Sequence, residues 1–335
     1  MGKATIKDVA KKANVSITTV SFVLNNKAEH ISPETIEAVK KACKELNFER
    51  NHIASSLKSK TTNTIGLIVP EIDNNYYSRI VSEVDALVSE KGYILLTAFS
   101  SNDFEREISL LYQMVARQVD YLLLLPSSAA LNKQNSQKLL EVLNELPIKF
   151  VILDRKTKLN HHTEVVNDDI EGGQLASEYL VQQGYKRIAC ITGPEEVSSS
   201  DDRLIGYRSI LEKYNIPFDE TLIYVGDYSF NTAINLATQI LNRNDIDAIF
   251  AFNDMSAYAA YFVSDKMNRK VGQDISIVGF DDNAFSSLIT PALTSIRQDI
   301  KEICRVAVEE LFKEDNTRQV IKIKPRLMER ESVKK

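Results

Sequence analysis

From about residue 62 onward this chain repeats one pattern, in which short apolar runs alternate with amphipathic stretches of helical spacing such as Ile80–Leu87 and Ile108–Val115. A strand that is apolar on both faces must be covered on both faces, and strand–helix alternation achieves this in a parallel sheet. Eight or more strands predict two sheets and therefore an α/β core of two lobes. The runs interpreted as strands are Ile65–Val69, Tyr93–Ala98, Tyr121–Leu125, Phe150–Leu153, Ile188–Ile191, Ile223–Val225, Ala248–Phe252 and Ile275–Val278.

The first sixty residues have a different pattern, that of three short helices. Thr5 and Asp8 have the spacing of a capping box at the start of a first helix. Ser16 is expected to cap a second helix. Ser32 and Pro33 predict the start of a third, because serine is a preferred cap and proline a preferred first helical residue. The apolar positions expected to face inward are Val9, Ala10, Ala13, Val15, Val20, Val23, Leu24, Ile36, Val39, Cys43 and Leu46.

A tight turn at Asn14-Val15 between the first two helices is typical of a helix-turn-helix, although another small three-helix bundle would have the same pattern. The outer face of the second helix favours DNA binding, because short hydroxyl and aromatic side chains there can enter a major groove. These side chains are Ile17, Thr18, Thr19, Ser21 and Phe22.

The charge of the chain is unevenly distributed. Residues 1–60 contain 11 Lys/Arg and 6 Asp/Glu, a net charge of +5, whereas the whole chain carries −5, so that the remaining residues carry −10. A basic head on an acidic body indicates contact with nucleic acid at the head alone.

Polar and aromatic residues follow several predicted strands, where ligands of open α/β sheets bind. Carboxylate, guanidinium and carboxamide groups can each bridge two vicinal hydroxyls, and aromatic rings cover the apolar face of a sugar ring. Taken singly, Asp154, Asn253 and Asp281 are typical of helix caps. Six such segments at equivalent places indicate a hydroxyl-binding site. They are Asp73-Asn74-Asn75-Tyr76-Tyr77, Asp154-Arg155, Asp201-Asp202-Arg203, Asn253-Asp254, Gly279-Phe280-Asp281-Asp282 and, after Leu293–Ile296, Arg297-Gln298.

The segment from Thr5 to Asn25 resembles the headpiece of the LacI/GalR family of repressors, and residues 51–57 resemble that family's hinge helix. The resemblance covers essentially the whole chain, and the headpiece motif is long and specific. It implies that the second helix reads bases and that the hinge helix, at about residues 51–58, inserts Leu57 beside Ala54 into the minor groove, which requires a dimer. The DNA-binding residues that it implies are Thr5, Ser16, Ile17, Thr18, Thr19, Ser21, Phe22, Asn25, Asn51, Ala54, Leu57 and Lys58.

Phe22 departs from the family pattern, which usually has a polar or basic residue at this position. A phenylalanine contacts a thymine methyl group but cannot donate a hydrogen bond to guanine. Either the operator differs from the family's common palindrome, or Phe22 packs against the headpiece.

The core resembles the periplasmic sugar-binding fold of LacI/GalR regulators, whose lobes close on a ligand, and is similar position by position to ribose-binding members. It departs from them in having tyrosine for phenylalanine in the aromatic pair and Asn75 where proline is common. The hydroxyl groups that these tyrosines add either bind a larger sugar or point into water. Tyr228 either lines the mouth of the pocket or is an aromatic residue on the surface. The implied effector-binding residues are Asn74, Tyr76, Tyr77, Asp154, Arg155, Arg203, Tyr228, Asn253, Asp281 and Gln298.

Together these observations predict an all-α headpiece at residues 1–60 and an α/β core at residues 61–335. One lobe is expected at about residues 62–160 and 298–325, the other at about residues 161–297 and 326–335. The expected protein is a cytoplasmic repressor that binds double-stranded operator DNA as a homodimer and is released by a small sugar. Ribose is the first candidate effector, and sucrose, fructose or a sugar phosphate are alternatives.

Two other kinds of regulator fit less well. Purine-responsive members stack the base on an aromatic residue where Arg155 stands and carry a basic residue where Val197 stands. Members that bind a phosphocarrier protein lack the Asp202-Arg203 pair.

Other classes of protein are disfavoured. The sequence contains no nucleotide-binding glycine motif, nucleophile elbow or zinc-protease motif, so we expect neither catalysis nor a cofactor. Cys43, Cys190 and Cys304 lie far apart, which argues against a disulfide framework and a zinc site, and we expect no metal. A sugar carrier would need export, but the N-terminus lacks the apolar core of a signal peptide. No apolar run approaches the ~20 residues that span a bilayer, so no membrane contact is expected.

Overall fold

The structure is a computed structural model of the chain and describes residues 4–24, 28, 30–48, 61–157, 162–314 and 318–334. It divides into two compact units, Met1–Thr62 and Asn63–Lys335. Within the described residues, no helix is both long enough and apolar enough to cross a membrane.

The first unit packs three helices, α1 (Ile6–Ala13), α2 (Ile17–Leu24) and α3 (Pro33–Glu45), around a small apolar core. The Asp8 carboxylate accepts the backbone N–H of Thr5 at 2.8 Å, and Ser16 Oγ accepts that of Thr19 at 3.0 Å, so both helices begin at the predicted caps. Asn14 adopts a left-handed backbone with φ 53°, which ends α1 and turns the chain into α2. The buried side chains are Val9, Ala10, Val20, Val23, Val39 and Ala42.

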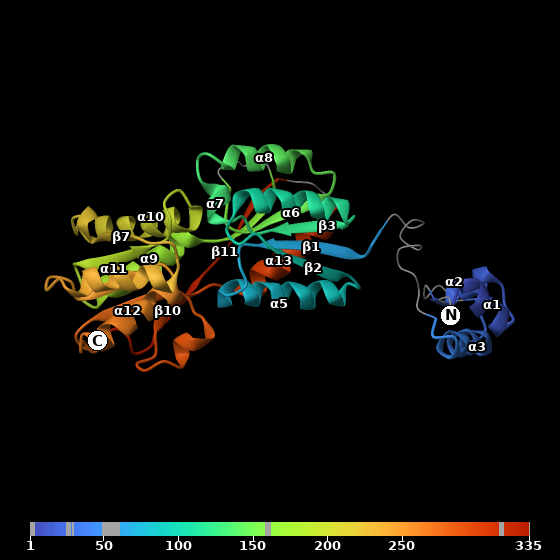
Figure 1. The fold of residues 1–335 in the computed structure, drawn as a ribbon. Coiled ribbons are helices and arrows are strands. Elements are labelled where there is room, and N and C mark those ends of the chain that lie inside the picture. Colours follow the sequence, from blue (N-terminus) through green and yellow to red (C-terminus); the bar gives the residue numbers. More distant parts are fainter. Residues whose placement is uncertain are drawn as a thin grey trace. The chain divides into compact units, whose positions relative to one another are not determined.

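The second unit contains two six-stranded sheets, one in each lobe, which confirms the predicted α/β class (Figure 1). The first sheet is parallel throughout, in the order β11-β5-β4-β3-β1-β2. Its strands are β1 (Thr64–Val69), β2 (Ile94–Phe99), β3 (Tyr121–Leu124), β4 (Lys149–Asp154), β5 (Glu164–Asn167) and β11 (Val320–Ile323).

The second sheet has the order β12-β10-β9-β8-β6-β7 and is parallel except at its edge, where β12 runs antiparallel to β10. Its strands are β6 (Ile188–Thr192), β7 (Ile223–Val225), β8 (Ala248–Ala251), β9 (Ser276–Asp281), β10 (Thr294–Arg297) and β12 (Arg326–Met328). The eight predicted apolar runs all overlap with strands of these two sheets.

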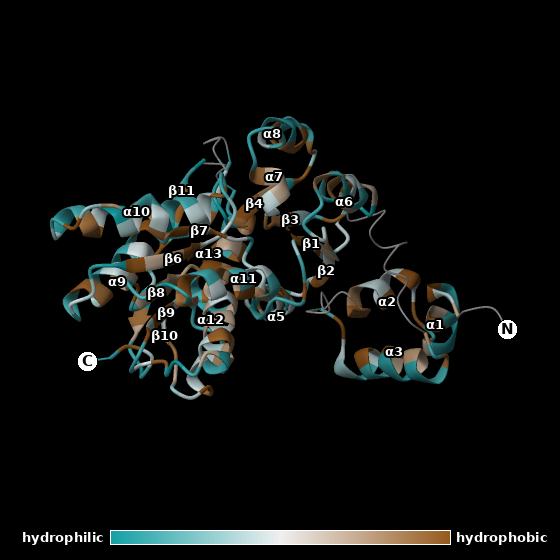
Figure 2. Ribbon diagram, turned by 60° about the vertical axis from the view of Figure 1, so that its left-hand side comes forward, coloured by the Kyte–Doolittle hydropathy of each residue, from teal (hydrophilic) through white to brown (hydrophobic). Residues whose placement is uncertain are grey.

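Helices cover both faces of each sheet, as apolar strands require. In the first lobe α5 (Asn75–Glu90) and α13 (Ile300–Phe312) cover one face, and α6 (Phe104–Ala116), α7 (Ser128–Leu131) and α8 (Ser136–Glu145) the other. In the second lobe α9 (Asp169–Gln182) and α10 (Ser198–Lys213) lie opposite α11 (Phe230–Leu241) and α12 (Asp254–Lys266). Figure 2 shows the strands largely hydrophobic between helices whose outer turns are hydrophilic. Two short 3₁₀ turns, η1 (Glu220–Leu222) and η2 (Ala284–Ser287), complete this lobe.

The boundary between the lobes, expected at about residue 160, lies somewhat later in the chain. Strand β5 pairs with β4 and β11 in the first sheet, so the first lobe continues through Asn167. The chain crosses to the second lobe only at Asp168, which caps α9. The other two crossovers, between β10 and α13 and between β11 and β12, lie near the expected positions.

Candidate functional site

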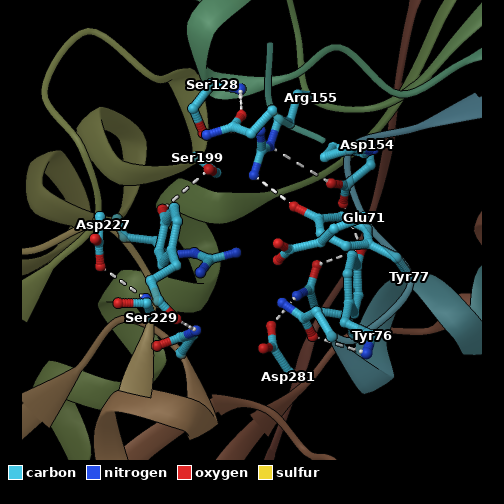
Figure 3. Close-up of a pocket in the computed structure, with 17 residues that line it drawn as sticks. Glu71, Tyr76, Tyr77, Ser128, Asp154, Arg155, Ser199, Asp227, Ser229 and Asp281 are labelled. Carbon is cyan, nitrogen blue, oxygen red and sulfur yellow. Dashed lines mark hydrogen bonds and ion pairs between the residues drawn. The ribbon is translucent and has the colours of Figure 1, made fainter. Parts of the chain in front are cut away.

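A cavity of about 240 Å³ lies between the two lobes, beyond the carboxyl ends of the parallel strands (Figure 3). All ten residues predicted to bind an effector line it. In Figure 3, Glu71, Tyr77 and Asp154 of the first lobe face Ser199, Asp227 and Ser229 of the second across the open space. Residues separated by more than two hundred positions in the chain therefore meet in one polar site.

The Tyr76 hydroxyl is the centre of a buried network on the first-lobe side. It donates to Asp154 Oδ1, and Asn167 Nδ2 lies 3.0 Å from both the Tyr76 hydroxyl and the same carboxylate oxygen. Burial raises the pKa of Asp154 above its ordinary value, although Arg155 and these hydrogen bonds oppose the shift. The network holds the Asp154 carboxylate in place at the end of β4.

Arg155 holds the second tyrosine. Its Nη2 donates to the Tyr77 hydroxyl at 2.6 Å, and its Nη1 donates to the Pro126 carbonyl and to Ser128 Oγ, each at 3.1 Å. Both tyrosines are almost fully buried, and their hydroxyls are bonded to protein groups. The hydroxyls therefore do not reach solvent, which was one of the two alternatives that the sequence left open.

On the second-lobe side Arg203 of α10 forms a buried ion pair, with its Nε 2.8 Å from Asp169 Oδ1. The guanidinium also stacks 3.6 Å from the centre of the Phe280 ring. Burial raises the pKa of Asp169 even beside this cation.

Two glycines allow this pairing by bringing α9 and α10 close together. A Cβ at Gly206 would lie 2.3 Å from the Ile170 carbonyl oxygen, and one at Gly173 would lie 2.3 Å from the Arg203 carbonyl oxygen. Any larger residue would push the two helices apart and draw Arg203 away from its carboxylate.

Asn253 and Asn74 act as helix caps and also line the cavity. Asn253 Oδ1 accepts the backbone N–H of Ser256 at 3.0 Å, which caps α12, while its Nδ2 donates to the Tyr228 carbonyl at 2.9 Å. Asn74 caps α5 through the backbone N–H of Tyr76. The cap and the binding-site interpretations of these residues are therefore compatible.

Three cavity residues have left-handed backbones: Asp154 with φ 75°, Tyr228 with φ 68° and Asp281 with φ 108°. Side chains other than glycine adopt this region at a cost of about 1–3 kcal/mol each, and such residues cluster at functional sites. Tyr228 is half-buried and lines the cavity, with its hydroxyl 3.1 Å from Ser199 Oγ, so its ring is not an isolated surface aromatic.

Sequence reasoning missed seven residues that line the same cavity. Most of them follow strand ends, so a systematic inspection of every strand end would have found them. They are Pro70, Glu71, Asn102, Ser128, Ser199, Asp227 and Ser229.

The predicted DNA-reading face of α2 is open in the headpiece. Ile17 is 45% exposed and Phe22 is 46% exposed, whereas Val20 and Val23 of the same helix are buried. Phe22 is absent from the apolar core of this unit, so it does not pack there. Thr18 is also exposed, Ser21 is half-buried, and Thr19 shares a hydrogen bond with Ser16. The predicted residues Asn25, Asn51, Ala54, Leu57 and Lys58, and the hinge helix, lie outside the described residues.

Comparison with known proteins matches each unit to a family. Residues 5–51 match the bacterial regulatory proteins of the lacI family, and residues 177–333 match a periplasmic binding protein-like domain. The chain is 34% identical over 337 residues to the HTH-type transcriptional repressor PurR of Shigella sonnei, covering 98% of this chain and 97% of that protein. It is 31% identical to PurR of Vibrio atlanticus, covering 99% of each.

Solved structures show the same relationship. The lac repressor dimer bound to operator and the anti-inducer ONPF is 26% identical, with a TM-score of 0.87 over 100% of both chains. The transcriptional regulator CelR in complex with cellobiose is 30% identical, with a TM-score of 0.72 over 98% of this chain and 99% of that one. With its helix-turn-helix unit and its two-lobed core, this chain belongs to the LacI family of bacterial regulatory proteins.

Proposed function

We propose that this protein is a transcriptional repressor that binds operator DNA as a homodimer and releases it when a small sugar occupies the cavity between the lobes. The observation that carries the proposal is the cavity lining, in which planar polar groups and tyrosines converge from both lobes. The open face of α2 supplies the DNA-reading surface.

The chemistry of the lining favours a polyhydroxylated ligand. Asp154, Asp281, Arg155 and Arg203 offer both acceptors and donors in the paired geometry that vicinal hydroxyls require. A cavity of about 240 Å³ lies just below the range of ~300–1,000 Å³ that is usual for ligand sites, which suits a monosaccharide. Ribose remains the first candidate because the sequence around these residues resembles ribose-binding members of the family.

A purine is the second candidate, because PurR proteins are among the similar sequences. Two observations weigh against it. Val197, which replaces a basic residue of purine-responsive members, is buried at the N-terminus of α10 and does not line the cavity. Arg155 presents a cation bound to Tyr77 where those members stack an aromatic ring.

Association into a dimer is supported by exposed apolar side chains on the second lobe. Phe285 and Leu288, three positions apart at η2, are 60% and 72% exposed. These two neighbours form an exposed apolar surface that a second copy of the chain can cover. In such a dimer the two headpieces bind the two half-sites of an operator.

The proposed signal is a change in the arrangement of the lobes. Ion pairs join the two lobes beside the cavity: Lys133 Nζ lies 2.9 Å from Glu196, and Lys156 Nζ lies 2.6 Å from Asp202. A sugar held by both lobes selects the closed arrangement, and we expect the segment that the sequence predicts as a hinge, residues 51–58, to transmit this change to the DNA-binding unit.

Calorimetry on the full-length protein tests the effector, with D-ribose, fructose, sucrose and a purine base as separate titrants. We expect saturable heat with ribose that falls at least tenfold in affinity in Arg203→Lys and in Asp281→Asn. Arg208→Lys is the matched control, since Arg208 does not line the cavity. If only the purine base binds, the effector is a purine and the proposal of a sugar is wrong. Absence of heat with every titrant would refute the assignment of a free sugar.

The same protein then serves in a DNA-binding assay. DNA fragments selected from a random library by the full-length protein would be titrated with and without the effector. We expect a two-fold symmetric site whose affinity falls when the effector is bound. An affinity that rises with the effector would reverse the proposed sign and make the ligand a co-repressor.

A further inference from the structure

A second cavity, of about 480 Å³, lies where β10 leads into α13 and β11 leads into β12. Its walls come from four separate parts of the chain: α5, the segment after β9, the segment from Arg297 to Lys301, and β12. Five cations line it, Arg79, Arg297, Lys301, Arg326 and Arg330, together with two carboxylates, Asp282 and Asp299.

Both carboxylates already have partners. Asp282 accepts from Arg297 Nε and Arg330 Nη2, each at 2.6 Å. Asp299 caps α13 by accepting the backbone N–H of Glu302 at 3.2 Å. In the part of the chain that the structure describes, no carboxylate pairs with the three other cations, Arg79, Lys301 and Arg326.

The cations that line this cavity repel one another. Arg297 and Arg326 stand directly opposite each other across the β10–β12 pair, where like charges destabilise a sheet. The first turn of α13, which carries Lys301, contributes the positive end of the helix dipole to the same wall. An anion in the cavity relieves both effects.

Asn283 provides an independent indication of a ligand. It lines this cavity and is only 2% exposed, yet neither Nδ2 nor Oδ1 of its side chain has a hydrogen-bond partner among the described residues. Its backbone N–H is anchored to Asp254 Oδ2 at 2.7 Å, so the side chain is held at the cavity wall. A buried carboxamide without partners is costly, and its N–H₂ group is a suitable donor to an oxyanion.

The second cavity adjoins the first. Gln298 lines both of them. Asp281 lines the first cavity, and its neighbour Asp282 binds the arginines of the second. A ligand that displaces Arg297 or Arg330 from Asp282 therefore acts on the residue next to the effector-binding carboxylate.

We propose that this second cavity binds a small phosphate-bearing anion, inorganic phosphate or a phosphate monoester, and that its occupancy alters the affinity of the first cavity for its effector. Anion binding itself is independent of the effector's identity, whereas the coupling rests on the proposed function. Guanidinium groups bind phosphate oxygens in pairs, and three cations without carboxylate partners supply the charge that a dianion requires.

Calorimetry of the full-length protein at low ionic strength tests the binding, with inorganic phosphate and glycerol phosphate as separate titrants. We expect saturable binding that falls at least tenfold in Lys301→Ala and in Arg326→Ala. Arg305→Ala is the matched control, because Arg305 lies on the same helix but pairs with Glu302 and Glu309 outside the cavity. Preference for the monoester over inorganic phosphate identifies the source of the phosphate group.

Two further variants keep the result interpretable. Asn283→Ala removes the unpartnered amide and is expected to weaken anion binding while leaving the thermal midpoint unchanged or higher. Arg155→Ala, in the first cavity, is expected to leave anion binding unchanged. Loss of binding in Arg155→Ala with no loss in Arg326→Ala would place the anion in the first cavity and overturn the proposal, as would no binding at millimolar concentration.

Coupling is measured by titrating the effector in the presence and absence of saturating anion. A change in effector affinity of threefold or more, abolished in Arg326→Ala, is the expected outcome, and the anion's affinity must change by the same factor when the effector is saturating. Anion binding that leaves effector affinity unchanged would refute the coupling but not the site. If no effector is found, the anion titrations still decide whether the site exists.

Discussion

Gln298 Nε2 donates to Asp281 Oδ1 at 2.6 Å, and its amide oxygen lies 3.1 Å from the hydroxyl of Tyr76. Gln298 stands at the crossover after β10, Asp281 ends β9 of the second lobe, and Tyr76 belongs to α5 of the first. One carboxamide therefore connects the two walls of the effector cavity.

Replacement of this carboxamide by a carboxylate should open the cavity. Gln298→Glu places a second acidic group beside Asp281, and like charges at this distance repel strongly in a buried site. We expect at least a tenfold loss of effector affinity at pH 8, about 1.4 kcal/mol, and partial recovery at pH 5. Calorimetry at both pH values checks this, with Gln273→Glu on the exposed surface as the control. Equal losses at the two pH values would contradict the charge argument.

Gly193 is predicted to be essential for the position of Tyr228. A Cβ at residue 193 would lie 2.1 Å from Cζ of the Tyr228 ring, so Gly193→Ala must displace the ring. We expect weaker effector binding and a loss of stability of about 1–3 kcal/mol, the usual cost of overpacking. Urea unfolding compares the stability of Gly193→Ala with that of the double variant Gly193→Ala/Tyr228→Ala. The double variant should regain most of the stability, and a double variant as unstable as the single one would instead implicate the backbone at residue 193.

The ion pairs between the lobes should make effector binding sensitive to salt. Lys133→Ala/Lys156→Ala removes the contacts to Glu196 and Asp202, and ion pairs that solvent reaches contribute little and are screened by salt. We expect a several-fold loss of effector affinity at low salt that disappears at 1 M NaCl. Lys138→Ala is the matched control, because its partner Glu105 lies in the same lobe. The same loss in that control would rule out lobe closure as the cause.

Glu164 should make the stability of the first lobe depend on pH. Burial raises its pKa to about 7, above its ordinary value of 4.5, although hydrogen bonds from Thr157 oppose the shift. Because the folded state holds this proton more tightly than the unfolded state, the contribution of Glu164 is fully present below about pH 4.5 and is lost as pH rises through 7.

Glu164→Gln removes that dependence while keeping an oxygen that accepts from Thr157. Relative to the wild type, the variant should gain on the order of 1–3 kcal/mol in free energy of unfolding between pH 5 and pH 8. Urea unfolding at the two pH values checks this. Glu145→Gln, at an exposed position, should show no such difference. A variant that loses stability at pH 8 would mean that Glu164 is needed in its charged form.

Phe22 should read a thymine methyl group. Because it is 46% exposed and outside the headpiece core, Phe22→Ala is expected to lower DNA affinity without changing the thermal midpoint. Replacing individual thymines of the selected site with uracil removes the methyl group. The wild type should lose several-fold in affinity at one position per half-site, and Phe22→Ala should lose nothing further there. Val23→Ala, in the core, should instead destabilise the headpiece.

The local architecture of this protein follows from its sequence. The caps at Thr5, Ser16 and Ser32 and the continuous apolar runs of the core are local signals, because hydrogen bonds to a first turn and burial on both faces of a strand leave a pattern within a few residues. The residues that follow the apolar runs also marked the site, since the carboxyl ends of parallel strands meet at one edge. All ten predicted residues share one cavity for that reason.

Tertiary structure decided the rest. The apolar runs of the sequence predicted none of strands β5, β11 and β12, and the placement of β5 in the first sheet became evident only from its partners β4 and β11. The hydroxyl of Tyr77 is held by Arg155, 78 positions away, and the second cavity gathers cations from residue 79 to residue 330. Such contacts depend on how the lobes pack and on where the chain crosses between them. No segment of the sequence carries that information alone, because each side chain is placed by the burial of residues elsewhere in the chain.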